Sequence, residues 1–128
     1  MREYGMHNRI ELIITEAGSM YEMANLTKTI TGIIPVIFCS PKGDARHECR
    51  VKVSNVIGKM TAEDTFSIEL KDLSVNGYRK LPADQLESVK WWIHQNRFAI
   101  LDYWKERTDT RDFMNSLKSI NLKEEGPR

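Results

Sequence analysis

Hydrophobic and polar residues alternate along several stretches of the chain, and this pattern predicts β-strands. The clearest alternations lie at residues 8–16, 47–53 and 66–70. Residues 27–38 are rich in threonine and isoleucine, which favours another extended segment, made irregular by a glycine and a proline. The apolar members of the three alternations are Ile10, Leu12, Ile14, Cys49, Val51, Val53, Phe66, Ile68 and Leu70. We therefore expect a sheet with one apolar face and one solvated face.

Residues 81–106 repeat apolar positions at steps of three and four, which predicts one long amphipathic helix. Pro82 suits the first turn of this helix, because proline loses no hydrogen bond there. All three tryptophans of the chain lie in the segment. The main stripe consists of Leu86, Val89, Ile93, Arg97, Ile100 and Trp104.

A shorter helix is expected after Asp109, whose carboxylate can cap it, with Phe113, Leu117 and Ile120 as its apolar stripe. Strands thus come first and helices last, which is typical of an α+β fold. The predicted architecture is an antiparallel sheet of four or five strands packed against one long C-terminal helix, followed by a short helix.

The expected organisation is a single α+β domain at residues 26–122. Residues 1–25 are expected to form an N-terminal extension that contains a strand, with a helical turn or linker at residues 19–25. Residues 123–128 are expected to form a polar tail. Within the domain, the Asn76-Gly77 pair predicts a tight turn with a positive φ.

Composition is ordinary for a globular protein, with 41% hydrophobic residues and a formal net charge of +1 over 128 residues. This balance produces no overall field for nucleic acid or anionic lipid, although residues 42–59 hold five basic and two acidic side chains. The longest apolar stretch, at residues 33–39, is far shorter than the roughly 20 residues that span a bilayer. With two cysteines and no signal-peptide pattern, we expect a cytoplasmic protein with reduced thiols and no membrane contact.

Three features recur in a known family. The first strand of the domain reads Thr29-Ile30-Thr31-Gly32-Ile33-Ile34, and a turn leads from it to Arg46-His47-Glu48-Cys49. The third feature is Leu81-Pro82 followed by Leu86, Val89, Trp92, Arg97, Leu101 and Trp104. Over roughly residues 26–106 the chain resembles the small bacterial family called domain of unknown function 4160.

The chain departs from that family at two positions. Cys49 stands where the second histidine of a His-x-His pair is usual, and Asn96 stands where a histidine precedes the arginine of the helix. Family members usually begin near the equivalent of Met23, so residues 1–22 look like an addition. The resemblance implies a bacterial, cytosolic, partner-binding protein, because such proteins are suspected to form toxin–antitoxin pairs with a small companion.

Cys39, His47 and Cys49 are candidate zinc ligands, since one imidazole and two thiols suit that ion, with His7 or His94 as a fourth ligand. The spacing lacks paired C-x-x-C units, and cysteines are often buried as small hydrophobic residues. The plainer interpretation is a surface histidine and two core cysteines. We therefore expect no metal and no cofactor.

Asp44, Arg46, His47 and Arg50 are candidates for a phosphate site, because arginine binds phosphate and histidine transfers protons near neutral pH. Such a site would suit an RNA-directed toxin. The plainer interpretation is a solvated turn and strand face. A Cys49–His47 nucleophile pair is not expected, because neighbours on one strand face lie too far apart for a direct hydrogen bond.

The helix at residues 81–106 carries more aromatic surface than one core contact needs. Its candidate partner-binding residues are Trp91, Trp92, Arg97, Tyr103 and Trp104, since tryptophan and arginine dominate interface energies. Trp92 and Trp104 differ by about 120° around a helix of ~3.6 residues per turn, so one narrow stripe cannot bury both.

The sequence contains no catalytic signature. We expect a small bacterial protein-interaction module, one component of a toxin–antitoxin-like pair, that binds a companion protein or a second copy of itself. The alternatives are an RNA-directed, ribonuclease-like toxin at the His/Arg site and a small zinc-binding protein. Nucleic acid is a weaker candidate partner than protein.

Overall fold

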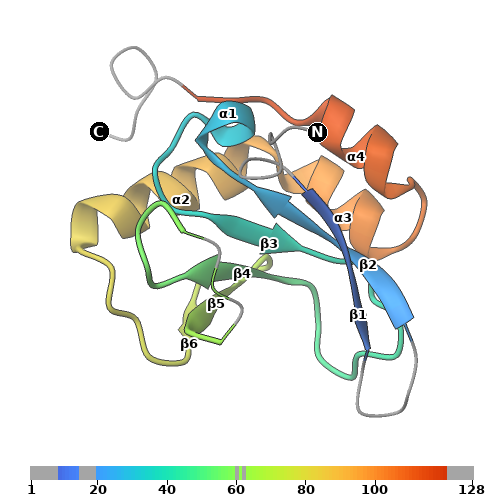
Figure 1. The fold of residues 1–128 in the computed structure, drawn as a ribbon, viewed down its shortest axis with the longest axis horizontal. Coiled ribbons are helices and arrows are strands. Elements are labelled where there is room, and N and C mark those ends of the chain that lie inside the picture. Colours follow the sequence, from blue (N-terminus) through green and yellow to red (C-terminus); the bar gives the residue numbers. More distant parts are fainter. Residues whose placement is uncertain (1–8, 15–19, 60, 62, 121–128) are drawn as a thin grey trace.

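The computed structural model describes residues 9–14, 20–59, 61 and 63–120. Strands come first along these residues and the larger helices come last (Figure 1). The elements are β1 (Arg9–Ile14), β2 (Met20–Leu26), α1 (Lys28–Thr31), β3 (Ile37–Cys39), β4 (Arg50–Ser54), β5 (Thr65–Glu69), β6 (Val75–Asn76), α2 (Ala83–Gln95), α3 (Arg97–Trp104) and α4 (Thr110–Ser116).

The strands form one antiparallel sheet in sequence order, β1 to β6, so that every strand pairs with its neighbours along the chain. This confirms the expected α+β class. The sheet has six strands rather than four or five, partly because residues 20–26 form β2 instead of a turn or linker. The boundary expected between an extension and a domain at residues 25 and 26 falls inside this strand, whose Ala24 lies in the main core.

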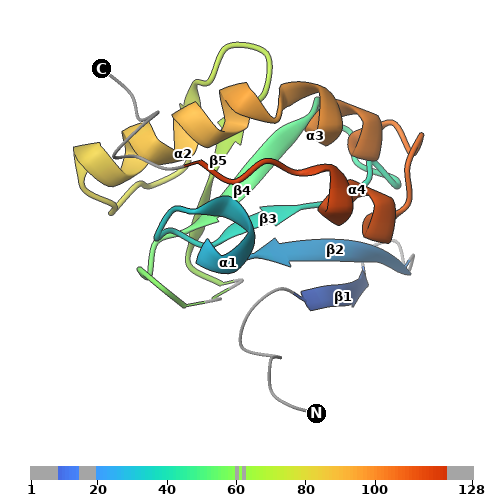
Figure 2. The ribbon, with the colours of Figure 1, turned by 90° about the horizontal axis from the view of Figure 1, so that it is seen from above.

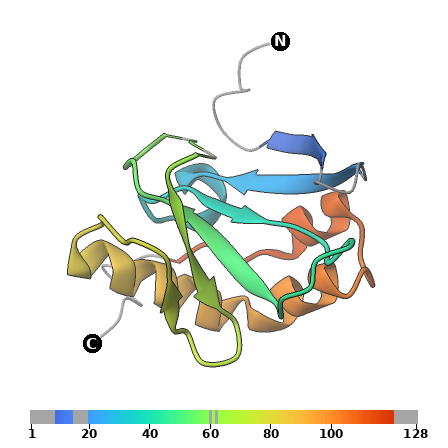
Figure 3. The same ribbon diagram turned by 90° about the horizontal axis from the view of Figure 1, so that it is seen from below.

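The helices cover one face of the sheet, as Figures 2 and 3 show from opposite sides. Val51, Val53, Phe66 and Ile68 point toward this layer and are 0–2% exposed, because successive side chains of a strand alternate between its faces. The helices contribute Leu86, Val89, Trp92, Ile93, Ile100, Tyr103 and Phe113 to the same core. Each fully buried side chain of this size stabilises the fold by roughly 1.5–3 kcal/mol.

The expected single helix at residues 81–106 is interrupted, and this is a correction. It forms two helices, because Asn96 (φ −115°, ψ 20°) lies between α2 and α3. The Asn96 side chain is 3% exposed and donates from Nδ2 to the carbonyl oxygens of Trp92 and Lys118, each at 3.0 Å. Its Oδ1 accepts from the Lys118 backbone N–H at 2.7 Å. A side chain that bonds to backbone in this way competes with regular helix geometry.

The segment after α4 is held against the helices and α1 by backbone contacts. α4 begins as expected, with the Asp109 carboxylate accepting from the Asp112 N–H at 2.7 Å, but it ends at Ser116, so Leu117 and Ile120 lie beyond it. Ile120 donates its N–H to the Thr31 carbonyl at 2.9 Å and is 4% exposed. A Cβ at Gly32 would lie 2.1 Å from the Ile120 oxygen, so this position requires glycine.

Residues 27–38, expected as one irregular strand, contain α1, a turn and part of β3. The buried Thr31 hydroxyl oxygen lies 3.2 Å from both the Thr27 and the Ile33 carbonyl oxygens, to one of which it donates, and it accepts the Ile33 N–H at 3.1 Å. Gly32 follows in a left-handed conformation (φ 82°). These local bonds reverse the chain direction and outweigh the extended preference of threonine and isoleucine. At residues 76–77 the expected positive φ is confirmed for Gly77 (φ 98°).

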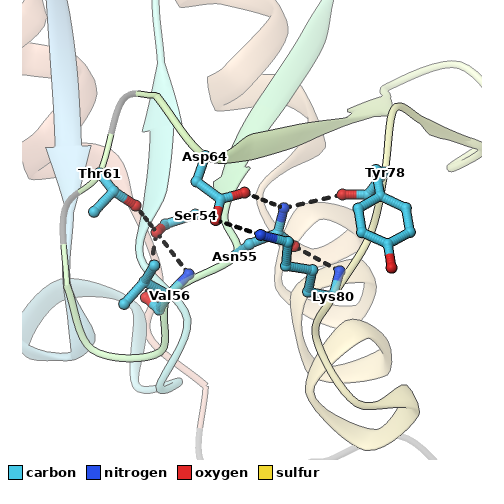
Figure 4. A network of polar contacts seen from close by, with 7 residues as sticks. All are labelled: Ser54, Asn55, Val56, Thr61, Asp64, Tyr78 and Lys80. Atoms are coloured by element: carbon cyan, nitrogen blue, oxygen red, sulfur yellow. Dashed lines mark hydrogen bonds and ion pairs between the residues drawn. The ribbon is translucent and has the colours of Figure 1, made fainter.

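A polar network joins the loop between β4 and β5 to the segment before α2 (Figure 4). Asn55 donates from Nδ2 to Asp64 Oδ1 at 3.1 Å and to the Tyr78 carbonyl at 2.9 Å, and accepts the Lys80 N–H at 2.7 Å. Lys80 Nζ also lies 2.8 Å from Asp64 Oδ2. Hydrogen bonds from Lys80 and then Asn55 lower the pKa of the Asp64 carboxyl below its usual range. The network positions the chain for entry into α2.

We expect Asn96→Ala to lower the free energy of unfolding by about 1–3 kcal/mol, because it leaves the Lys118 peptide groups without their buried partners. Urea unfolding of the whole chain measures this change. Asn115→Ala, at an exposed position of α4, is the matched control and should change stability by less than about 0.5 kcal/mol. Equal urea midpoints for the two variants would show that the Asn96 hydrogen bonds make no net contribution to the free energy of unfolding.

Candidate functional site

A pocket of about 570 Å³ lies between the loop that joins β3 to β4, residues 70–71 after β5, and helix α3. The loop is tied to the end of α3 because Lys42 donates its N–H to the Trp104 carbonyl at 2.9 Å. Gly43 N–H also donates to Glu106 Oε2 at 3.2 Å. These two bonds bring residues some 60 positions apart into one site, and Figure 3 shows the loop beside α3.

Positive charge dominates the rim of this pocket. Lys42, Arg46, Lys71, Arg97 and Lys105 line it, and Glu48 is the only acidic lining residue among those described. Glu48 lies 3.6 Å from Lys71 Nζ, but both side chains are mostly exposed, so this ion pair is weak. Five cations around one concave surface produce a locally positive potential, although the net charge of the whole chain is only +1.

The floor and one wall of the pocket are apolar. Cys49, Leu70, Leu101 and Trp104 form this surface. Helix α3 supplies Arg97, Leu101 and Trp104, which recur at steps of four and three and share one side of the helix, and Lys105 follows directly at its end. Arg97 also donates from Nη2 to the Lys71 carbonyl at 3.1 Å, which closes the wall between α3 and the end of β5. The pocket therefore combines an apolar base with a cationic rim.

His47 lies at the edge of the pocket against Trp104. The two ring centroids are 5.4 Å apart, with 32° between the ring planes. Nδ1 of His47 lies 2.8 Å from the Glu48 carbonyl oxygen. Because a carbonyl oxygen only accepts, Nδ1 carries the proton in this hydrogen bond, and in the neutral ring Nε2 is the acceptor. Nε2 of His47 is thus able to accept a hydrogen bond.

A second, smaller pocket of about 90 Å³ adjoins the first, since His47 and Trp104 line both. Arg50 and Lys52 of β4 contribute to it from the face of the sheet opposite the helices. Arg50 Nε is buried and has no hydrogen-bond partner in the described part of the protein. An unpaired buried donor is costly, so this nitrogen is ready to bind an acceptor.

The candidate phosphate residues are brought only partly together. Arg46 and His47 line the larger pocket, and Arg50 lines the smaller one beside His47. Asp44 is exposed in the loop and lines neither pocket. Lys71 and Lys105 also line the larger pocket, and the sequence does not indicate them, because each is a single lysine whose neighbours carry no related pattern.

The candidate partner-binding residues are mostly not available to a partner, which corrects that expectation. Trp92 and Tyr103 are 0% and 1% exposed. Helix α4 covers Tyr103, whose ring stacks on Phe113 at 4.3 Å and whose hydroxyl lies 2.8 Å from the Thr110 hydroxyl. Trp104 is 7% exposed, and both Trp104 and Arg97 line the pocket. Of the five candidates, only Trp91 is neither buried nor part of the pocket, and it is half-buried.

The exposed aromatic rings are different ones. Phe98 on α3 is 80% exposed, and Tyr78 before α2 is 75% exposed. Trp91 stacks on His94 with centroids 5.9 Å apart. Helical periodicity in the sequence could have indicated Phe98, since it directly follows Arg97 of the expected stripe and so lies about 100° away from it around the helix.

The candidate zinc ligands do not form a metal site. No group of three potential ligands among histidine, cysteine, aspartate and glutamate occurs within the described ranges, and His7 lies outside them. Both cysteines are buried free thiols. Burial, and then the charge of Cys49, raises the pKa of the Cys39 thiol far above its usual value. Burial, and then Glu69, raises the pKa of Cys49 to about 12 against the opposing charges of Arg97 and Lys105. Zinc binds the thiolate, which both sites disfavour.

Comparison with protein-family models, with curated proteins and with solved structures found no match to this chain. The resemblance to the domain of unknown function 4160 therefore stays a prediction. None of the helices in the described ranges is both long and apolar enough to cross a lipid bilayer.

We expect both cysteines to resist alkylation by iodoacetamide at pH 8, because thiols with raised pKa values stay protonated. The native rate should be at least about a hundredfold below the rate in denaturing urea, where the pKa returns to its ordinary value. The same shifts stabilise the fold only below about pH 9. As the pH rises further, the unfolded thiols ionise first and stability falls. Native and unfolded rates of similar size would contradict this account.

Proposed function

We propose that the protein binds a small phosphate-bearing ligand with a flat ring, of the nucleotide class, in the pocket between α3 and the β3–β4 loop. The observation that carries the proposal is the convergence of five cations around an apolar base in one concavity. Its volume of about 570 Å³ lies within the roughly 300–1,000 Å³ that is typical of small-molecule sites.

The two halves of such a ligand match the two kinds of surface. Phosphate oxygens suit Arg46 and Arg97, because a guanidinium offers paired donors in the geometry of a phosphate, and Lys42, Lys71 and Lys105 add point charges. The ring suits Leu70, Leu101 and the edge of Trp104, which exclude water. A ligand with only one of the two halves would leave the other surface solvated, so affinity should require both.

The proposal concerns binding. An RNA-directed toxin, the sequence-based alternative, would need a second proton-transfer group beside His47, since cleavage of a phosphodiester requires both a base and an acid. It is supported by the positions of Arg46, His47 and Arg50 and weakened by the position of Asp44.

Titration calorimetry of the whole chain with adenosine 5′-monophosphate should show saturable binding. Adenosine alone and inorganic phosphate alone should each bind at least about tenfold more weakly, because each occupies one half of the site. Arg46→Ala and Lys105→Ala, both at exposed positions, should each weaken binding of the nucleotide by about tenfold. Each should also reduce the dependence of log affinity on log salt by about one unit or less.

Arg111→Ala is the matched control, since it removes a charge from an exposed position of α4 that lines neither pocket. It should leave both the affinity and the salt dependence unchanged. Absence of nucleotide binding at millimolar concentration, or equal losses in all three variants, would overturn the proposal.

We further propose, as a second function, that a companion protein or a second copy docks on the outside of the α2–α3 pair. Phe98, 80% exposed on α3, is the observation that favours it, because a large ring so exposed loses unfavourable hydration when a partner covers it. The stacked Trp91 and His94 on α2 would extend the contact. A bacterial toxin–antitoxin pair remains one form that such a partnership would take.

Light scattering of the whole chain across a concentration series tests the version with a second copy. Association should be reversible and should be lost in Phe98→Ser, because serine removes the apolar contact. Tyr78→Ser is the control, since Tyr78 is 75% exposed and lies before α2. This function would be excluded by two results together. The chain would stay monomeric at all concentrations, and it would bind no protein encoded beside it in the genome.

A further inference from the structure

We propose that the ligand is a strand of nucleotides joined by phosphodiester bonds, rather than a single nucleotide. This inference rests on the proposed nucleotide-binding function. The first nucleotide occupies the larger pocket, and the strand passes His47 so that the next phosphate lies on Arg50 and Lys52 in the smaller pocket.

The two pockets adjoin at the ring pair of His47 and Trp104, which lines both. The two ring centroids are 5.4 Å apart and Trp104 is 7% exposed, so the pair forms a divider between the two pockets. A ligand that is too long for the larger pocket would meet these two rings where it leaves that pocket. A flexible sugar–phosphate backbone is able to cross the divider, where Nε2 of His47 can accept a hydrogen bond from a ribose hydroxyl.

The smaller pocket has the chemistry of a phosphate subsite. Its titratable lining residues are Arg50, Lys52 and His47, and no carboxylate lines it among the described residues. At about 90 Å³ it is far below the size of ordinary ring-binding sites, so it suits one phosphate group better than a second base. Arg50 and Lys52 are two positions apart on β4 and share one face of the strand.

Arg50 lacks the partner that its position would suggest. Its cross-strand neighbour in the register of β4 and β5 is Glu69. The Glu69 carboxylate instead accepts a hydrogen bond from the Asn76 side chain. Arg50 Nε is consequently buried without an acceptor among the described residues. A phosphate at the smaller pocket, which Arg50 lines, would supply a charged acceptor for its guanidinium group. This orphan donor is the reason to place a second phosphate here rather than a further neutral group.

The test compares three ligands by titration calorimetry with the whole chain: adenosine 5′-monophosphate, adenosine 5′-diphosphate, and diadenylate with a 5′-phosphate. We expect the diadenylate to bind about tenfold more tightly than the monophosphate, because its second phosphate reaches Arg50. The diphosphate should not show this gain, since its added phosphate follows the first directly and does not cross the His47–Trp104 divider.

Arg50→Ala should abolish the tenfold difference while it changes the affinity for the monophosphate by less than about twofold. Because Arg50 is partly buried in a strand, Lys52→Ala provides a second variant at an exposed position and should reduce the difference about threefold. Lys59→Ala, exposed in the loop after β4, is the matched control and should leave the difference intact.

The outcomes separate the two proposals. No binding of any of the three ligands means that the nucleotide-binding function itself is wrong. Binding of the monophosphate with equal affinity for the diadenylate overturns only the strand. An equal gain for the diphosphate also overturns it, because charge alone would then explain the increase. Titrations with the ribose and the deoxyribose forms of the diadenylate distinguish RNA from DNA as the source of the strand. A higher affinity than that of the monophosphate, with either form, supports the proposal.

Discussion

The Asn96 side chain sets the geometry on which the pocket depends. It is buried, bonds to the Trp92 carbonyl within its own helix, and binds both peptide groups of Lys118 from a segment 22 residues away. One amide group thus separates α2 from α3 and anchors the chain that follows α4. Because α3 begins at the next residue, its direction determines where Arg97, Leu101, Trp104 and Lys105 point. A straight continuation of α2 would carry these side chains along a different path.

The second constraint is the backbone pairing between the β3–β4 loop and the end of α3. The N–H groups of Lys42 and Gly43 bond to the Trp104 carbonyl and the Glu106 carboxylate. Glu106 has a positive φ of 61°, so the chain turns sharply there and presents its side chain to the loop. The cations around the apolar base come from three separate parts of the sequence: the β3–β4 loop, residue 71, and residues 97–105. A chain with nearly balanced charge acquires in this way a local site for an anion.

The aromatic residues show how burial depends on more than one packing surface. Trp92 and Trp104 are separated by about 120° around a regular helix, so one stripe packed on a sheet could not bury both, yet they are 0% and 7% exposed. The protein instead interrupts the helix, packs His47 of the β3–β4 loop against Trp104, and stacks Phe113 of α4 on Tyr103. The rings nominated for docking therefore stabilise the core, while Phe98 remains exposed on the other side of α3.

The sequence by itself determined the α+β class, the inward face of β4 and β5, and the cap at Asp109, because each depends on residues close together in the chain. Strand alternation, helical periodicity and a capping carboxylate are local patterns that hold before any tertiary contact forms. The sequence also marked Arg46, His47 and Arg50 as a group, since they lie within five positions. The tertiary structure decided the rest. β2 exists because β1 and β3 offer ladders on both sides, the helix breaks because Lys118 supplies partners for Asn96, and Lys71 and Lys105 join the site because a loop bonds to the end of α3. Each of these depends on groups distant in sequence, and no local pattern records which distant group will be near.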